Sequence, residues 1–150
     1  MINETLKPTG ELEIILKGPD GKIKEQKTVP NLVVNSGKYA IASRLIGTAT
    51  AVFSHMALGS GVVAAVAGDT TLGTPYASTR PTVTVTGGTG SVNTVTYSAT
   101  FAPGNSTGSV TEAGIFNALT GGSMLARTVF NSVYKDTLDT LTINWTITFN

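Results

Sequence analysis

The sequence contains no cysteine and a single histidine, His55, among its 150 residues. The absence of cysteine excludes a disulfide framework, a cysteine-ligated zinc site and a thiol nucleophile. A single histidine excludes a histidine-rich metal site within one chain. These absences disfavour most enzyme classes, so the composition favours a binding or structural protein.

Charged residues are scarce, at 13% of the sequence, which is about half the usual share of roughly 25%. Ten Lys and Arg residues against nine Asp and Glu leave a formal net charge of +1. A general nucleic-acid-binding protein usually has a basic excess gathered on one face. We therefore expect no nucleic-acid partner.

Long apolar runs are also missing. The longest apolar stretch, residues 61–68, contains only Val, Ala and Gly, and it is far shorter than the roughly 20 residues that a membrane helix needs. The first ten residues include Glu4 and Lys7 and have no apolar core of signal-peptide length. We expect a product that neither enters a membrane nor is secreted.

The few charges are unevenly placed. Only four of them fall within residues 45–134, namely Asp69, Arg80, Glu112 and Arg127. A soluble monomer normally spreads its charges over its surface. The neutral stretch therefore has two interpretations: a surface kept soluble by Thr, Ser, Asn and Gly, or a surface covered by another chain.

Alternation of apolar and polar residues predicts strands over most of the chain. Residues 11–18 and 22–29 form a predicted hairpin around Pro19-Asp20-Gly21, and the lysines of its second strand indicate a sheet edge. Further strands are expected over 51–58, 82–86, 92–101, 109–118, 124–130 and 138–149. We predict one buried face composed of Leu141, Ile143, Trp145, Ile147 and Phe149 with Val95, Tyr97 and Phe101.

One short helix is expected between the predicted strands at 22–29 and 51–58. Asn35 or Ser36 is its predicted N-cap and Gly47 its predicted C-cap. Apolar residues recur at helical spacing and Lys38 and Arg44 lie between them, so these two charges are expected on the exposed side. The apolar positions assigned to the core are Tyr39, Ile41 or Ala42, Leu45 and Ile46.

The elements together predict an all-β fold with one short helix, an antiparallel sandwich of jelly-roll-like or Greek-key type. An immunoglobulin-type sandwich is the competing fold, but the paired cysteines of antibody domains are absent. We expect an N-terminal arm, residues 1–10, and one sandwich domain, residues 11–150. Residues 59–80 form a long loop without periodicity, and such loops are commonly functional or interaction arms.

No catalytic, cofactor or metal site is predicted. Ser54, His55 and Asp69 are an improbable triad, because neighbouring residues on a strand point to opposite faces. Asp136 and Asp139 are expected to cap a turn. Glycine-rich stretches do not match a phosphate-binding loop, and no calcium-binding loop is present.

Two groups of residues are predicted to have structural or binding roles. Glu112 and Arg127 are expected to form a structural ion pair, either across neighbouring strands or between subunits. His55, Tyr76 and Arg80 are assigned to a candidate interface.

Several short segments between residues 30 and 150 together resemble a pattern that recurs in virion proteins of tailed bacteriophages. The segments are ALGSG at 57–61, AGDTTLG at 67–73, VTYSATF at 95–101, TEAGIFN at 111–117, MLAR at 124–127 and DTLTINWTITF at 139–149. The resemblance implies a β-rich virion component of the head-decoration, cement or tail-fibre type. It implies no active-site residue.

From this resemblance we expect a non-enzymatic capsid decoration or cement protein on the outside of the phage head. Its expected partners are the major capsid protein and further copies of itself, as a homo-oligomer and most simply a trimer. Residues 1–10 and 59–80 would be arms that reach neighbouring subunits. The alternative is a tail, baseplate or fibre component that contributes to host attachment, and an enzyme is a third, disfavoured class.

Overall fold

The computed structural model describes residue 2 and residues 4–48, 50–90 and 92–150. The described residues form nine strands and one helix, in the order β1 (Pro8–Lys17), β2 (Ile23–Pro30), β3 (Leu32–Val33), α1 (Asn35–Leu45), β4 (His55–Gly59), β5 (Thr84–Gly87), β6 (Thr94–Phe101), β7 (Gly108–Phe116), β8 (Met124–Lys135) and β9 (Thr140–Phe149).

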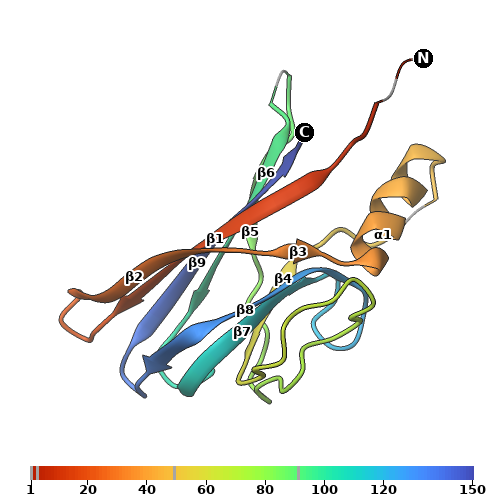
Figure 1. The fold of residues 1–150 in the computed structure, drawn as a ribbon. Helices are drawn as coiled ribbons and strands as arrows, with labels where there is room; N and C mark the ends of the chain where they lie inside the picture. Colours follow the sequence, from red (N-terminus) through yellow and green to blue (C-terminus); the bar gives the residue numbers. More distant parts are fainter. Residues whose placement is uncertain (1, 3, 49, 91) are drawn as a thin grey trace.

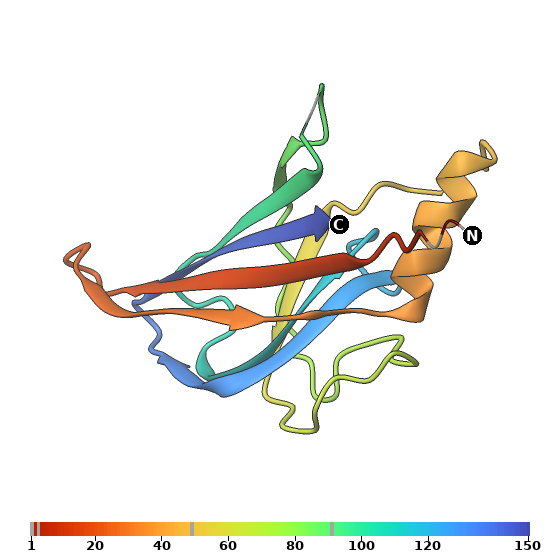
Figure 2. The same ribbon diagram turned by 45° about the horizontal axis from the view of Figure 1, so that its top comes forward.

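The strands form two antiparallel sheets that pack face to face as a sandwich (Figure 1). One sheet has the order β2-β1-β9-β6-β5 and the other the order β3-β8-β7-β4. Strands β6 and β9 are neighbours in the first sheet, whereas the β7–β8 hairpin that follows β6 lies in the second. The predicted all-β sandwich is confirmed. Figure 2 shows α1 at one end of the sandwich, away from the β1–β2 turn.

The core contains the apolar face of β9. Leu141, Ile143 and Trp145 are fully buried. Trp145 is in register with Tyr97 on β6, and Leu141 is in register with Phe101. The predicted core face is confirmed at these positions and at Ile147, whereas Phe149 and Val95 at its end are only partly buried.

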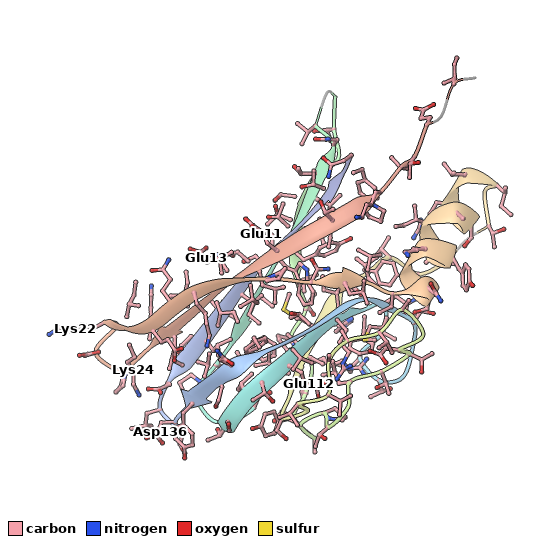
Figure 3. All side chains as sticks on the ribbon, viewed as in Figure 1. Glu11, Glu13, Lys22, Lys24, Glu112 and Asp136 are labelled. Carbon is pink, nitrogen blue, oxygen red and sulfur yellow. The ribbon has the colours of Figure 1, made fainter. Side chains whose placement is uncertain are left out.

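The outer face of the five-stranded sheet is polar, and its side chains bond to one another. Ser98 on β6 donates to Asn144 on β9, and Asn144 donates to Glu13 on β1. Gln26 on β2 donates to the same carboxylate, so the chain of hydrogen bonds crosses four strands. Figure 3 shows Glu11 and Glu13 along this outer side of β1. This face therefore needs little charge to remain in water.

The first strand begins earlier than the sequence predicted. β1 starts at Pro8, which is in register with Phe149 on β9. Lys7 and Asn150 continue the ladder, with N···O distances of 2.9 and 3.2 Å. Residues 8–10, assigned to an N-terminal arm, belong to the sheet because the end of β9 offers them a hydrogen-bonding edge.

The helix has the predicted length but a different N-terminus. Its N-cap is Val34, which makes no side-chain capping bond. Ser36, a predicted cap, instead donates its hydroxyl to the carbonyl of Met124, at 2.7 Å. Gly47 follows the helix with φ +74, a left-handed conformation that glycine adopts without strain.

The face of α1 that packs against the sandwich was predicted only in part, because Ile41 packs against the core as expected but the other assigned residues do not. Its buried residues are Gly37 and Ala40, whereas Tyr39, Leu45 and Ile46 are exposed. The small residues let the helix backbone approach β8 closely. A larger apolar face would hold the helix further from the strand.

Replacing Gly37 with alanine is expected to destabilise the fold. Alanine favours a helix over glycine by about 1 kcal/mol, but a methyl group here would overlap the backbone carbonyl oxygen of Leu125. The helix must therefore shift away from β8, and the midpoint of urea unfolding should fall. Lys38→Ala, at the next and exposed position, is the control, and equal stability of Gly37→Ala and the native chain would contradict this packing.

Candidate interaction surface

Glu112 on β7 and Arg127 on β8 form a buried ion pair within the chain. The Nη2 and Nε atoms of Arg127 donate to Oε2 of Glu112 at 2.8 and 3.1 Å. The two side chains are 0% and 3% exposed, Glu112 being the more buried. The structure thus brings together the two residues assigned to an ion pair, across neighbouring strands of one protomer.

The carboxylate of Glu112 also holds both ends of a loop. Oε1 accepts the backbone N–H groups of Gly61 and Thr74, at 3.0 and 2.6 Å. Oε2 accepts the N–H of Gly73, at 2.9 Å. A Cβ atom at Gly61 would overlap the carboxylate, so this close approach requires glycine. Figure 3 shows Glu112 on β7 beside the yellow-green loop.

Arg127 binds the outer part of the same loop. Its Nη1 atom lies 2.7 Å from Oδ2 of Asp69, and its Nη2 atom donates to the carbonyl of Val63 at 3.1 Å. Residues 61–74 are thus bound to the chain's own four-stranded sheet. This part is therefore not a free arm, and its contact with a neighbouring subunit stays a prediction.

Residues 76–81, which follow this loop, cover the β4 edge of the four-stranded sheet. The N–H of Met56 on β4 donates to the carbonyl of Pro81, and the N–H of Tyr76 donates to the carbonyl of Leu58. A covered edge strand has few free backbone groups with which to pair another chain. This edge is therefore a poor place for a partner to add a strand.

Two residues of the predicted interface make contacts within the chain. The Tyr76 hydroxyl donates to the carbonyl of Ser109, at 2.9 Å. Arg80 donates to the carbonyls of Ala118 and Gly121, at 3.0 and 2.9 Å. Its guanidinium carbon also lies 3.8 Å from the centroid of the Phe116 ring. Both side chains are half-buried and tie the loop to β7 and the turn after it.

His55, the third predicted interface residue, is half-buried and bonds to its neighbour. Oγ of Ser54 lies 2.9 Å from Nδ1 of His55. The expectation that these two side chains could not meet is wrong, because β4 begins at His55 and Ser54 lies outside the strand's alternation. Asp69 pairs with Arg127, so the three residues are not brought together as a triad.

The carboxylates of the β8–β9 turn lie as predicted. The N–H of Asp136 donates to Oδ2 of Asp139, at 3.0 Å. Asp139 also pairs with Lys24 on β2, at 2.7 Å. The second contact joins the turn to the edge of the other sheet.

Sequence reasoning missed a buried lysine at the end of β8. Lys135 is fully buried and donates from Nζ to the carbonyl of Ala102, at 2.9 Å. Burial lowers the pKa of Lys135, and the nearby charge of Asp139 partly opposes that shift. The signal was present, because Lys135 lies two residues after the buried Val133 and alternation places both on the inner face.

Glu112 is bound by Arg127 and by the backbone N–H groups of Gly61, Gly73 and Thr74, and we call this set of contacts the clamp. The clamp is expected to make the stability of the fold depend on pH. Burial raises the pKa of Glu112, but hydrogen bonds from Thr74, Arg127, Gly73 and Gly61 outweigh it and hold the pKa below the ordinary value of 4.5. A carboxyl with a lowered folded pKa stabilises the fold above its unfolded pKa, and this stability is lost as pH falls through the folded value.

We therefore expect the melting temperature to fall as pH decreases below about 4.5. Glu112→Gln cannot titrate, so its melting temperature should be lower at pH 7 and should change less between pH 7 and pH 3. Asp69 and Asp139, whose pKa values are also lowered, remain in this variant and supply the residual slope. Equal slopes for the two proteins would contradict the role of Glu112.

Apolar side chains remain in solvent around the C-terminal half of α1. Leu45 and Ile46 are 85% and 80% exposed, and Tyr39 and Val52 are also exposed. Val52 also lines a groove of about 480 Å³ between α1, the residues before β4 and strands β5 and β6. Its lining consists of Ala40, Ile41, Arg44, Val52, Phe53, Ser54, Val83, Val85 and Tyr97. We call these residues, with Tyr39, Leu45 and Ile46, the α1 surface.

The α1 surface suits an apolar partner. Arg44 is the one charged residue in the groove lining of the described chain. Exposed apolar patches of this kind usually mark interaction sites. The α1 surface was not predicted, because the apolar residues of the helix were assigned to the core. The charge-poor stretch 45–134 had nevertheless indicated that some surface is covered.

The described residues offer neither a membrane-spanning helix nor a metal-binding cluster. No helix there combines the length and apolar character that a membrane span requires. No group of three or more His, Asp or Glu side chains is placed to hold a metal ion in the same part of the chain. A scan of protein-family models, a search of curated proteins and a search of solved structures found no match to this chain.

Proposed function

We propose that this chain is a non-enzymatic structural protein of a tailed-bacteriophage virion, of the capsid decoration or cement type. It binds the outside of the head as a homo-oligomer, most simply a trimer, and contacts the major capsid protein. The observation that carries this proposal is the α1 surface, an apolar groove and helix face exposed on a sandwich with few charges. The resemblance of its sequence segments to virion proteins supports the same function.

The chemistry of the α1 surface favours binding over catalysis. Apolar side chains and one arginine can bury area against another protein, but they do not form the acid and base pair that hydrolysis requires. Glu112 and Arg127 bind one another and the backbone of the loop. Glu112 and Arg127 therefore stabilise the fold, and contact with a partner is assigned to the α1 surface.

A decoration protein stabilises a head by mass action. A protein that binds only the intact lattice stabilises it by its binding free energy, summed over many copies. The near-neutral charge fits a position outside the head, because the interior contains the packed genome. Heads without this chain should form with normal geometry and lose DNA at a lower temperature.

The test compares phage particles that carry the native chain, Leu45→Asp or no chain at all. Leu45→Asp should fold normally and fail to bind heads, because a carboxylate is placed on the α1 surface. Leu138→Asp is the matched control, since Leu138 is also exposed but lies in the β8–β9 turn. Electron microscopy locates the chain, and release of DNA on heating measures its effect.

One outcome would replace this function with the alternative. If heads without the chain resist heating equally well and the particles fail to attach to host cells, the chain is a tail, baseplate or fibre component. Binding of Leu45→Asp to heads as strong as that of the native chain would exclude the exposed end of α1, at Leu45 and Ile46, as the capsid contact.

A further inference from the structure

The groove of the α1 surface borders an open sheet edge. β5 is an outer strand of the five-stranded sheet, and among the described strands it pairs only with β6. Val85 on β5 and Val83 just before it line the groove, and Val85 remains 49% exposed. An extended segment added to β5 would bond to its backbone and direct every second side chain into the groove.

The segment before β1 has the pattern that such a site accepts. Ile2, Glu4 and Leu6 are spaced by two, so an extended chain places them on one side. Ile2 and Leu6 are exposed apolar residues, which match the apolar lining. Glu4 would meet Arg44 of the groove, and neither of these two charges belongs to an ion pair among the described residues.

The direction of the chain favours the groove of another copy. Lys7 exchanges hydrogen bonds with Asn150, which holds the start of the chain beside β9. Strands β9 and β6 separate β1 from β5 in the same sheet. Figure 1 shows residues 4–7 continuing from β1 away from the sandwich. The six residues before Lys7 span about 20 Å when extended.

We propose that the groove between α1 and β5 binds the N-terminal segment of a second copy of this chain. Ile2 and Leu6 enter the apolar lining, Glu4 pairs with Arg44, and the backbone of the segment extends the sheet at β5. The donating segment and the accepting groove are different surfaces, so copies join head to tail. A contact of this kind forms a closed ring when its rotation allows.

This inference names the contact that makes the proposed homo-oligomer, and it rests on the proposed function only for the role of that oligomer on a phage head. Its test needs the purified chain alone. The oligomeric state is measured by sedimentation over a range of concentrations. Deletion of residues 1–6 should leave the sandwich folded and convert the oligomer to a monomer.

Charge reversal tests the pairing of Glu4 with Arg44. Glu4→Arg and Arg44→Glu should each raise the dissociation constant about tenfold, and the double variant should restore it. Lys22→Glu in the β1–β2 turn is the control for a change of net charge. Arg44 also donates to the carbonyl of Thr50, so melting temperatures identify any loss of folding.

A designed disulfide distinguishes a second copy from the chain's own segment. The native sequence has no cysteine, so Leu6→Cys combined with Val85→Cys provides the only thiols. Oxidation should produce covalent oligomers in this variant, whereas Val85→Cys alone should not. A cross-linked species of monomer size would overturn the proposal, because it would place the chain's own segment in the groove.

Two further results would also overturn the proposal. One is a native chain that stays monomeric at every concentration, and the other is a deleted chain that associates as well as the native one. A deleted chain that remains oligomeric and still binds heads would exclude this contact and leave the proposed function intact. A native oligomer that forms through the N-terminal segment but binds no part of the virion would support this contact and exclude the proposed function.

Discussion

Replacing Trp145 with alanine is expected to lower the free energy of unfolding by about 3–5 kcal/mol. Trp145 is fully buried on the central strand β9. It is in register with Leu12 on β1 and Tyr97 on β6. Alanine would leave a cavity between the sheets that these neighbours can fill only in part. Urea unfolding should show a lower midpoint with an unchanged slope.

Two control variants separate packing from other effects at Trp145. Trp145→Phe should cost less than alanine, because it retains most of the apolar volume and Nε1 of Trp145 has no hydrogen-bond partner among the described residues. Thr146→Ala, on the outward face of the same strand, should cost less still. A midpoint for Trp145→Ala equal to that of the native chain would contradict the central position of this side chain.

Replacing Glu112 with alanine is expected to cost about 3–5 kcal/mol of stability, because it leaves the buried Arg127 partly uncompensated. It also removes the acceptor of three backbone N–H groups in residues 61–74. Amide hydrogen exchange at Gly61, Gly73 and Thr74 should therefore accelerate more than exchange in β9. This local signature distinguishes release of the loop from a general loss of stability.

A double-mutant cycle tests the pairing itself. Glu112→Gln combined with Arg127→Met should destabilise the fold less than the sum of the two single variants, because the double variant leaves neither member of the pair buried alone. Lys27→Met and Glu25→Gln provide a comparison pair, since both side chains are partly exposed and exposed pairs contribute little. Additive losses for Glu112 and Arg127 would show that the two side chains act independently.

The clamp has a consequence for the proposed function. It holds residues 61–74 against the sheet, with Val62, Val63 and Val66 exposed on the outside. A partner that binds this loop would not have to order it first, and ordering is a cost that weakens the binding of mobile segments. The N-terminal segment is the opposite case, because its apolar residues Ile2 and Leu6 are exposed and would be covered only by a partner.

The strands could be predicted from the sequence because their signals are local. The alternation in β9 identifies Trp145 as a core residue without reference to any other strand. The β1–β2 turn follows in the same way from Pro19-Asp20-Gly21, where Gly21 has φ +77. Glu112 and Arg127 were recognisable as partners because they are the only charged residues between 81 and 134 and lie on adjacent predicted strands.

The tertiary structure alone decided the position of the loop, the orientation of the helix and the existence of the groove. The N–H of Gly61 bonds to a carboxylate 51 residues further along the chain, so no local pattern could reveal that contact. The apolar residues of α1 suggested a core face, but the backbone of β8 approaches so closely at Gly37 that no larger side chain fits there, and of the predicted apolar residues only Ile41 packs against the core among the described residues. The exposure of Leu45 and Ile46 follows from that steric limit, because a helix held by its smallest residues turns its larger apolar side chains toward water.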